Sequence, residues 1–412
     1  MLSVRKYLPL LLIIFSFTKL FAGGFQINLQ GNYQTAMAHC GTGFVTDAGG
    51  IFFNPGTLSF LKSNQITVGV NLIFHDTEYL EADPGNYTAR TQNTIGTPLN
   101  FYANYKFKKI QNLSAGLGIY TPFGSRVKYD DDWKGQFLLR EIDLKTFFIQ
   151  PTLSYQVTDK IGVGAGFVYS TGSLKLRKAL PVQDANGIYG DGELNGKANG
   201  VGFNAGIYFE ANAKLSLGIC YRSAVKVKVT DGNATFTVPS SLEKYFPATS
   251  FTTQITLPST TTFGIAYHHN KKLTLAFDCN YVGWKLYDTL SFDFKQNTEK
   301  LADIHSPRQY SNSFIYRLGV EYKWKENISL RAGAYFDQTP VKNGYLTPET
   351  PDADKISFTC GAGFKIIKNL HCDISFLYTE AKQRTDINIE TAFTGTWKSN
   401  ALVPGINITY NF

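Results

Sequence analysis

Large apolar side chains alternate with polar ones along much of this 412-residue chain. In the last twelve residues, ALVPGINITYNF, the side chains of Ile406, Ile408 and Tyr410 share one face, and the polar residues between them share the other. The stretches 272–284 and 313–324 alternate in the same way. A period of two is that of a β-strand, in which successive side chains point to opposite faces. The alternation therefore predicts an all-β fold.

Short and long polar connections alternate between these stretches. The short ones are KKIQN, VTDK, ANAK, HNKK, KEN and KN. The predicted strands, fourteen in number, are 64–75, 98–108, 111–122, 145–157, 160–176, 199–211, 213–229, 252–269, 271–288, 313–324, 327–338, 355–367, 369–384 and 400–412. The predicted long connections are 76–97, 121–144, 177–198, 230–251, 289–312, 339–354 and 385–399. Short turns at one rim, long loops at the other and an even strand number are typical of outer-membrane barrels. The chain is predicted to be a transmembrane antiparallel β-barrel whose C-terminus returns to the periplasmic side.

Composition alone leaves two all-β classes open. Aromatic residues make up 15% of the chain, and the mean hydropathy is -0.15. A secreted soluble sheet protein fits these values, and so does a barrel with a lipid-facing aromatic band. The regular exchange of short and long connections favours the barrel, and with it a multi-pass location in the bacterial outer membrane.

The N-terminus has the three-part layout of a secretory signal peptide. Arg5 and Lys6 precede an apolar stretch, 7–17, which the small residue Ala22 follows. The stretch is shorter than the roughly 20 residues of a membrane-spanning helix, so residues 1–22 are predicted to be a cleaved signal. Removing them takes away three of the 40 Lys and Arg and lowers the formal net charge from +8 to +5. Such a small surplus argues against a nucleic-acid partner.

A turn lies inside the apolar stretch IFFNPGTLSF, at Asn54, Pro55 and Gly56. Turns normally lie at the surface, so something must cover this one. A barrel of fourteen strands encloses a lumen wider than its own side chains fill. Residues 23–63 are therefore predicted to form a hatch, or plug, inside a barrel made of residues 64–412.

Three stretches of the chain resemble the FadL/TodX (OmpP1) family of outer-membrane transporters. The run GGFQINLQGNYQTAMAHCGTGFVTDAGGIFFNPGTLSFL is similar to the hatch of that family, including its Asn-Pro-Ala element. GLGIYTPFGSRVKYDDDWKGQF and RAGAYFDQTPVKNGYLTPETPDADKISFTCGAGFKI follow in the family's order, and with the aromatic C-terminus the likeness spans essentially the whole mature chain. Two departures are Gly56, where Ala is usual, and Lys355, where Arg is common. The first is expected to loosen the turn slightly, and the second keeps the charge but loses bidentate reach.

The resemblance implies passive uptake of hydrophobic molecules such as long-chain fatty acids or aromatic hydrocarbons. The family captures them among extracellular loops, holds them against the hatch and releases them sideways at a kink in the third strand. Phe25 belongs to the hatch run, and Pro122, Phe123 and Gly124 lie where the kink is expected. Proline cannot donate to a sheet and glycine favours a bulge, so a local opening is expected there. The alternative is that TPFG only begins the following loop.

Charged residues also face the predicted lumen. Arg317, Glu321 and Arg331 share the inward phase of two neighbouring strands. With the KEN turn centred on Glu326, positions 321 and 331 lie opposite each other, which predicts a cross-strand ion pair. Arg317 is then a free cation, which either meets a ligand carboxylate or forms another salt bridge. With Lys355, these cations complete the predicted substrate-binding or gating residues.

The sequence indicates no cofactor, metal site or enzyme activity. The five Cys are scattered without a CxxC pair, the His lack a partner motif and no GxSxG stretch occurs. The predicted partners are a hydrophobic small molecule, outer-membrane lipid and lipopolysaccharide. Asp130–Asp132 is expected either to be solvated or to bridge to lipopolysaccharide through divalent cations, and the chain is expected to be a monomer. A general diffusion porin without a hatch is the main alternative function, and a haem-binding or structural barrel is less favoured.

Overall fold

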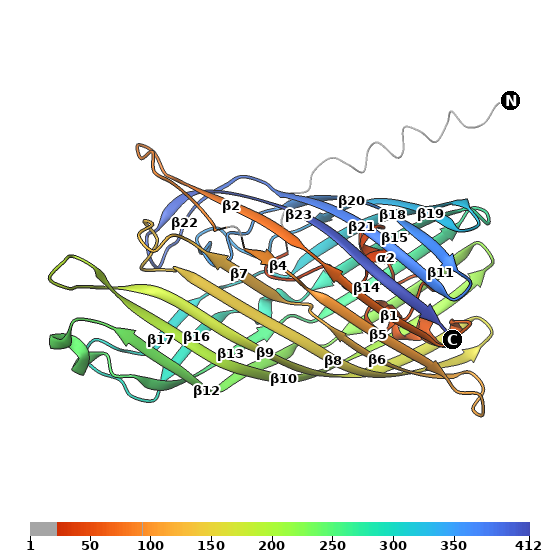
Figure 1. Ribbon diagram of the computed structural model, residues 1–412, viewed down its shortest axis with the longest axis horizontal. Helices are drawn as coiled ribbons and strands as arrows, with labels where there is room; N and C mark the ends of the chain where they lie inside the picture. The colour runs from red at the N-terminus through yellow and green to blue at the C-terminus, as the bar shows by residue number, and fades with distance from the viewer. Residues whose placement is uncertain (1–22, 93) are drawn as a thin grey trace.

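The computed structural model describes residues 23–92 and 94–412, so the predicted signal peptide lies outside the described residues. Strand segments form one antiparallel sheet that closes into a barrel (Figure 1). Segments that run end to end make up one barrel strand, which gives the fourteen strands predicted. In chain order these are β1 (Gln65–Asn71) with β2 (Ile73–Glu81); β3 (Thr88–Arg90), β4 (Ile95–Gly96) and β5 (Leu99–Lys106); β6 (Leu113–Tyr120) with β7 (Gly124–Lys128); β8 (Glu141–Thr158); β9 (Ile161–Gln183); β10 (Tyr189–Asn212); β11 (Leu215–Arg222) with β12 (Val225–Thr237); β13 (Thr249–Leu257) with β14 (Thr260–His268); β15 (Leu273–Val282) with β16 (Thr289–Phe294); β17 (Ile304–Pro307) with β18 (Ser313–Lys325); β19 (Ile328–Asp337); β20 (Lys355–Ile367); β21 (Leu370–Ala381) with β22 (Arg384–Ile387); and β23 (Thr394–Asn411).

The first and last barrel strands close the sheet. β1 pairs with β23 from Gln65 opposite Asn411 to Asn71 opposite Gly405, and β2 continues along the same strand. Closure is required because a strand edge in hydrocarbon leaves backbone N–H and C=O groups unpaired, at a cost of several kcal/mol each.

The outer face of the barrel is apolar. Along β18 the side chains of Phe314, Tyr316 and Leu318 are exposed, whereas Arg317 between them is only 1% exposed. β23 alternates in the same way. The lipid-facing phase predicted for these strands is therefore confirmed.

The two ends of the barrel differ. The C-terminus lies at the end that carries tight turns, and long hairpins extend from the opposite end (Figure 1). Because outer-membrane barrels have short periplasmic turns and longer extracellular loops, the C-terminal end is the periplasmic end.

Two of the predicted long loops are wrong. The stretch 385–399 belongs mostly to β22 and β23, which leave only residues 388–393 between them. The stretch 177–198 belongs mostly to β9 and β10, which leave only residues 184–188 between them. Beyond the apolar band the two strands still pair with each other, and Arg177 lies opposite Glu193. The polar residues suggested a loop, but opposite charges across a strand pair stabilise a sheet in water as well.

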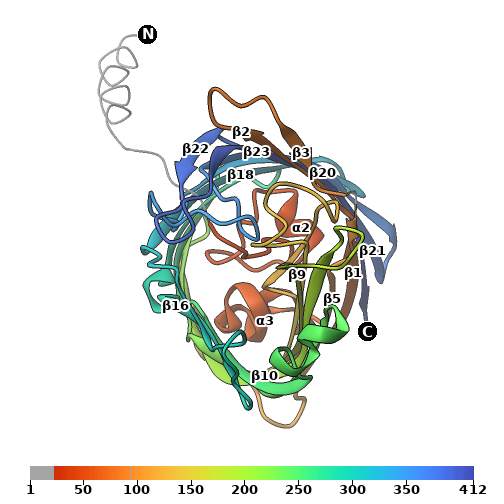
Figure 2. The same cartoon turned by 90° about the vertical axis from the view of Figure 1, so that its left-hand side faces the viewer.

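Residues 23–63, here named the lumen segment, lie inside the barrel (Figure 2). They include the single-turn helices α2 (Asn32–Thr35) and α3 (Gly50–Phe53) and the 3-10 helix η1 (Pro55–Phe60). Two more 3-10 helices lie in loops, η2 (Ser240–Tyr245) and η3 (Trp284–Leu286). No helix in the described part of the chain is long and apolar enough to cross a membrane.

The Asn-Pro-Gly turn is buried against β9 and β10. Asn54 accepts a hydrogen bond from the backbone N of Gly56 at 3.0 Å and donates to the carbonyls of Thr42 and Ile207, each at 2.9 Å. A Cβ on Gly56 would lie 2.7 Å from the carbonyl oxygen of Gly162. Glycine therefore permits a close approach of two backbones. The expectation that Gly56 loosens the turn slightly stays a prediction.

A buried ion cluster joins the barrel to the lumen segment. Glu321 and Arg331 lie opposite each other, as predicted, with Oε2 and Nε 2.8 Å apart. Arg331 also pairs with Asp373 of β21 at 2.5 Å, and its guanidinium lies 3.7 Å from the centre of the Tyr33 ring. One arginine thus compensates two buried carboxylates.

Replacing Arg331 with alanine would leave Glu321 and Asp373 buried without a counter-charge, at a cost of about 3–5 kcal/mol. We expect Arg331→Ala to lower the temperature at which the folded, fast-migrating barrel converts to the slow form on gels loaded without boiling. The exposed Lys382→Ala is the control and is expected to leave this temperature unchanged. Equal conversion temperatures for Arg331→Ala and wild type would contradict the role given to the cluster.

Candidate functional site

The third barrel strand is interrupted at residues 121–123, between β6 and β7. β6 pairs with β5 of the second strand as far as Tyr120, which lies opposite Asn100. Beyond that point β7 pairs with β8 on its other side. Pro122 has no N–H and cannot continue the ladder. Because β7 resumes the strand, TPFG does not simply begin a loop.

On the extracellular side of the interruption, the second barrel strand turns away from the third. Its segment β4 pairs with β2 of the first strand. The second and third strands meet again where Gln92 N donates to Lys128 O at 2.7 Å. Between this contact and Tyr120, the residues that the structure describes form no backbone hydrogen bond from one strand to the other. We name this gap the wall opening.

The lumen segment covers the wall opening from the inside. Ile27 N donates to Pro122 O at 2.9 Å, and Gly124 N donates to Phe25 O at 3.2 Å. These bonds satisfy backbone groups that the second strand does not reach, as buried backbone groups require. Residues 25–27 thus take the place of a neighbouring strand.

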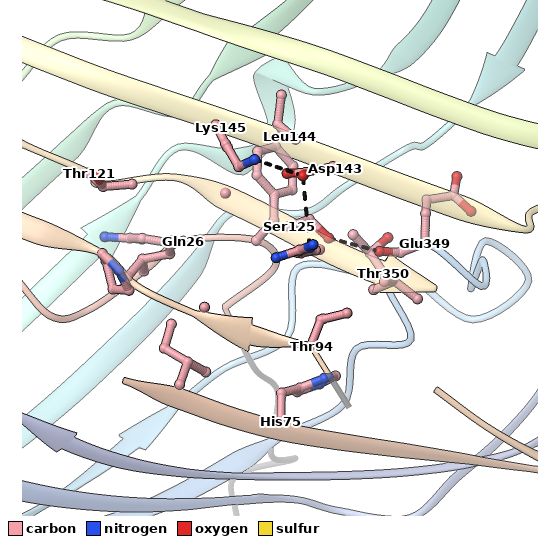
Figure 3. A pocket seen from close by; sticks show the side chains of 18 of the residues that line it. Gln26, His75, Thr94, Thr121, Ser125, Asp143, Leu144, Lys145, Glu349 and Thr350 are labelled. Carbon is pink, nitrogen blue, oxygen red and sulfur yellow. Dashed lines mark hydrogen bonds and ion pairs between the residues drawn. The ribbon is translucent and has the colours of Figure 1, made fainter. Parts of the chain in front are cut away.

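A cavity of about 430 Å³ lies at the wall opening (Figure 3). Residues from both sides of the opening line it, including Ile95 of β4 and Val127 of β7. Its other apolar side chains are Phe25, Ile27, Ile73, Pro98, Leu144, Phe147 and Pro351. Its ionisable side chains are His75, Arg126, Asp143, Lys145, Glu349, Asp352 and Lys355. An apolar surface with a charged margin therefore adjoins the gap in the wall.

The charged groups on the β7 and β8 side pair with one another. Asp143 accepts a hydrogen bond from Lys145 Nζ at 2.8 Å and lies 3.8 Å from Arg126 Nε (Figure 3). Glu349, from the loop before β20, pairs with Arg308 at 2.6 Å. These charges are therefore compensated before any ligand binds.

Lys355 joins the same loop to the start of the lumen segment. Its Nζ lies 2.8 Å from Asp352, which also accepts a hydrogen bond from the backbone N of Gly24 at 3.0 Å. Burial, together with the charge of Asp352, raises the pKa of the loop residue Asp354 to about 6. Lys355 is consequently part of an acidic corner of the cavity and not an isolated cation.

Aromatic rings surround Phe25. Its ring centre lies 4.9 Å from that of Trp284, 5.6 Å from Tyr287 and 6.1 Å from Phe123, each in an edge-to-face arrangement. Edge-to-face contacts of this kind stabilise apolar and aromatic groups. The place that Phe25 occupies therefore suits an apolar ligand.

Arg317 forms no ion pair among the residues that the structure describes, as predicted for a free cation, but neutral groups occupy its hydrogen-bond donors. Its guanidinium donates to Asn280 Oδ1 at 2.9 Å, to Asn28 Oδ1 at 3.0 Å and to the carbonyl of Ala38 at 3.2 Å. It also lies 4.8 Å from the ring centre of Tyr335. Two of its hydrogen-bond partners belong to the lumen segment, so Arg317 holds that segment to the barrel.

The predicted site residues fall into two groups. Phe25, Gly124 and Lys355 line the cavity, and Pro122 and Phe123 form the adjoining interruption. The others lie outside the cavity lining: Asn54, Pro55 and Gly56 form the buried turn of the lumen segment, and Arg317 and Arg331 of the barrel contact that segment.

Arg222 is not among the site residues predicted from the sequence. This residue is 6% exposed and donates to the hydroxyl of Tyr120 at 2.6 Å and to the carbonyl of Phe52 at 2.9 Å. It therefore ties the lumen segment to the strand that carries the interruption. Its position on the inward phase of LGICYR was the available signal, since a buried charge in a barrel wall needs partners.

Comparisons with known proteins agree with this architecture. The family model described as outer membrane protein transport protein (OMPP1/FadL/TodX) matches residues 13–412. Outer membrane protein P1 of Haemophilus influenzae is 24% identical over 95% of both chains. The long-chain fatty acid transport protein of Escherichia coli is 23% identical over 96% of both chains.

Two solved structures share the fold. A FadL homologue from Pseudomonas aeruginosa has a TM-score of 0.82 at 19% identity and covers 95% of this chain and 100% of its own. The toluene transporter TodX of Pseudomonas putida has a TM-score of 0.74 at 16% identity and covers 96% and 99%. Since the family model matches nearly the whole sequence, this chain belongs to the OMPP1/FadL/TodX family of outer membrane transport proteins.

Proposed function

We propose that this protein is a passive outer-membrane channel that captures hydrophobic molecules among its extracellular loops and releases them sideways through the wall opening. The Escherichia coli relative is named for long-chain fatty acids and the Pseudomonas putida structure for toluene, so fatty acids and aromatic hydrocarbons are both candidate substrates. The observation that carries the proposal is that the gap in the strand ladder and the apolar cavity coincide.

An apolar molecule has a physical reason to leave through the wall. Entering periplasmic water costs about 25 cal/mol for each Å² of apolar surface exposed, whereas entering hydrocarbon costs almost nothing. The route straight down the lumen is also packed, because Ile51 and Leu58 of the lumen segment are 0% exposed. Sideways release avoids both obstacles.

Release requires residues 25–27 to move, since they cover the opening. A ligand that takes the place of the Phe25 ring beside Trp284 and Tyr287 competes with the contacts that hold this stretch. Binding and opening are thereby coupled through one position. This is the gating role we assign to Phe25.

The charges of the cavity favour an uncharged substrate. Lys145 and Lys355 each pair with a carboxylate within the protein. A ligand carboxylate would have to compete with Asp143 or Asp352 for these cations. Aromatic hydrocarbons and protonated fatty acids meet no such competition.

The packed lumen segment argues against a general diffusion porin, because such a porin needs an open lumen. The proposed transport requires no catalysis. We propose the domain division of the sequence analysis, with residues 23–63 as the hatch. Contact with lipopolysaccharide and the monomeric state stay predictions.

Replacing Pro122 with Val and Gly124 with Thr supplies the missing N–H and two strand-forming residues. We expect this sealed variant to fold and reach the surface but to lose most uptake of a hydrophobic substrate, while binding persists. The matched control is Pro258→Val with Ser259→Thr, at the interruption between β13 and β14, outside the cavity lining. Uptake by the sealed variant equal to wild type at matched expression would rule out release here and favour passage past Asn54–Gly56.

Deleting residues 23–61 removes the packing from the lumen. We expect the deletion to turn a poorly conducting barrel into an open pore in planar bilayers, because the remaining lumen fills with water and ions. Heat-dependent gel mobility verifies that the shortened chain is a folded barrel. A folded deletion variant with wild-type conductance would show that the segment does not close the channel.

A further inference from the structure

Six lysines gather on one arc of the periplasmic rim. The turns from β14 to β15, β18 to β19 and β20 to β21 join neighbouring barrel strands. Their stretches, 269–272, 323–327 and 365–369, contain a single carboxylate, Glu326. These stretches carry six lysines, which we name the rim lysines: Lys271, Lys272, Lys323, Lys325, Lys365 and Lys368.

This arc holds as much surplus positive charge as the whole chain after residue 22. Six lysines and one carboxylate leave a surplus of five positive charges. The chain after residue 22 has 37 Lys and Arg against 32 Asp and Glu, which is also a surplus of five. The charges elsewhere in the protein therefore cancel, and the net charge is concentrated at this rim.

None of the rim lysines forms an ion pair within the described part of the chain. The lysines that form ion pairs there are different ones, namely Lys134, Lys145, Lys175 and Lys355. Neighbouring like charges repel one another, and a bound anion relieves this repulsion. The arc is thus prepared for an anionic partner.

Lipid-facing side chains place these lysines at the membrane surface. Trp324 and Ile366 are 51% and 58% exposed and continue the outward phase of β18 and β20. The ammonium of Lys325 lies 4.7 Å from the ring centre of Trp324. Aromatic side chains of this kind lie at headgroup level in membrane proteins, where lysines extend toward the polar region.

The arc is also hollowed. A cavity of about 590 Å³ is lined by five of the six rim lysines, with Trp324 and Phe364 as apolar neighbours. Its carboxylates are Glu326 and Asp373, and Asp373 already pairs with Arg331. Arg331 and Asp373, which also line it, lie on the inward phase of their strands, so the hollow opens at the periplasmic mouth of the lumen and sets several ammonium groups along that rim.

We propose that the rim lysines bind the phosphate groups of anionic phospholipids in the inner leaflet of the outer membrane. A phospholipid presents a phosphate next to acyl chains, which matches cations next to the outward-facing Trp324 and Ile366. Juxtamembrane lysines attract anionic lipid surfaces in this way. An acidic periplasmic protein would match the charge but not the lipid-facing residues. The site is independent of the uptake route.

The test titrates the purified full-length protein with lipid and counts bound molecules by native mass spectrometry. Wild type is expected to bind phosphatidylglycerol about tenfold or more tightly than phosphatidylethanolamine, a preference that falls with salt. Replacing all six rim lysines with glutamine is expected to abolish the preference, and replacing them with arginine is expected to keep it. The matched control changes six lysines nearer the extracellular end to glutamine, with the same loss of charge, at Lys226, Lys228, Lys244, Lys295, Lys300 and Lys342.

Three results would overturn the proposal. The first is a wild type with no preference for the anionic lipid, which would leave an acidic protein as the partner. The second is a folded six-glutamine variant that keeps the wild-type preference. The third is competition by soluble glycerol 3-phosphate as effective as that of the lipid, which would make this a site for free phosphate.

Discussion

Every backbone N–H and C=O group within the bilayer must find a partner in the protein, because hydrocarbon offers none. The closed sheet meets this condition around most of its circumference, including the seam between β1 and β23. The wall opening is the exception, and there Phe25 and Ile27 bond the third strand in place of the second. A gap in the wall is therefore stable only while something covers its backbone groups, which makes the cover a natural gate.

The lumen segment is held unequally along its length. Asp278 accepts hydrogen bonds from the backbone N–H groups of Gly41 and Thr42 at 3.1 Å each, and Arg317 donates to a carbonyl of the same segment. Hydrogen bonds to charged groups contribute about 1.5–3 kcal/mol, against 0.5–1.5 kcal/mol for neutral ones. Residues 25–27 depend on neutral backbone bonds and ring contacts. Movement is thus expected at residues 25–27, between Gly24, which donates to the carboxylate of Asp352, and the remainder, which stays in place.

The features that the sequence predicted depend on local pattern. Strand number and the pairing of Glu321 with Arg331 follow from a period of two and the centre of a short turn. Contacts between distant segments were beyond such reasoning: nothing local shows that the carbonyl of Ala38 meets Arg317. The stretch 177–198 failed for another reason, since polar composition does not distinguish a loop from strands that continue in water.

Photo-labelling with an apolar diazirine analogue of the substrate, followed by mass mapping of the adducts, tests sideways release most directly. Val127 and Leu144 are the reporters, because they line the cavity and are only 5% and 8% exposed. If release is sideways, Val127 and Leu144 both carry adducts, and an excess of unlabelled substrate prevents their labelling. Displaceable adducts confined to residues 54–58, with none on Val127 or Leu144, would contradict it and place the route through the lumen.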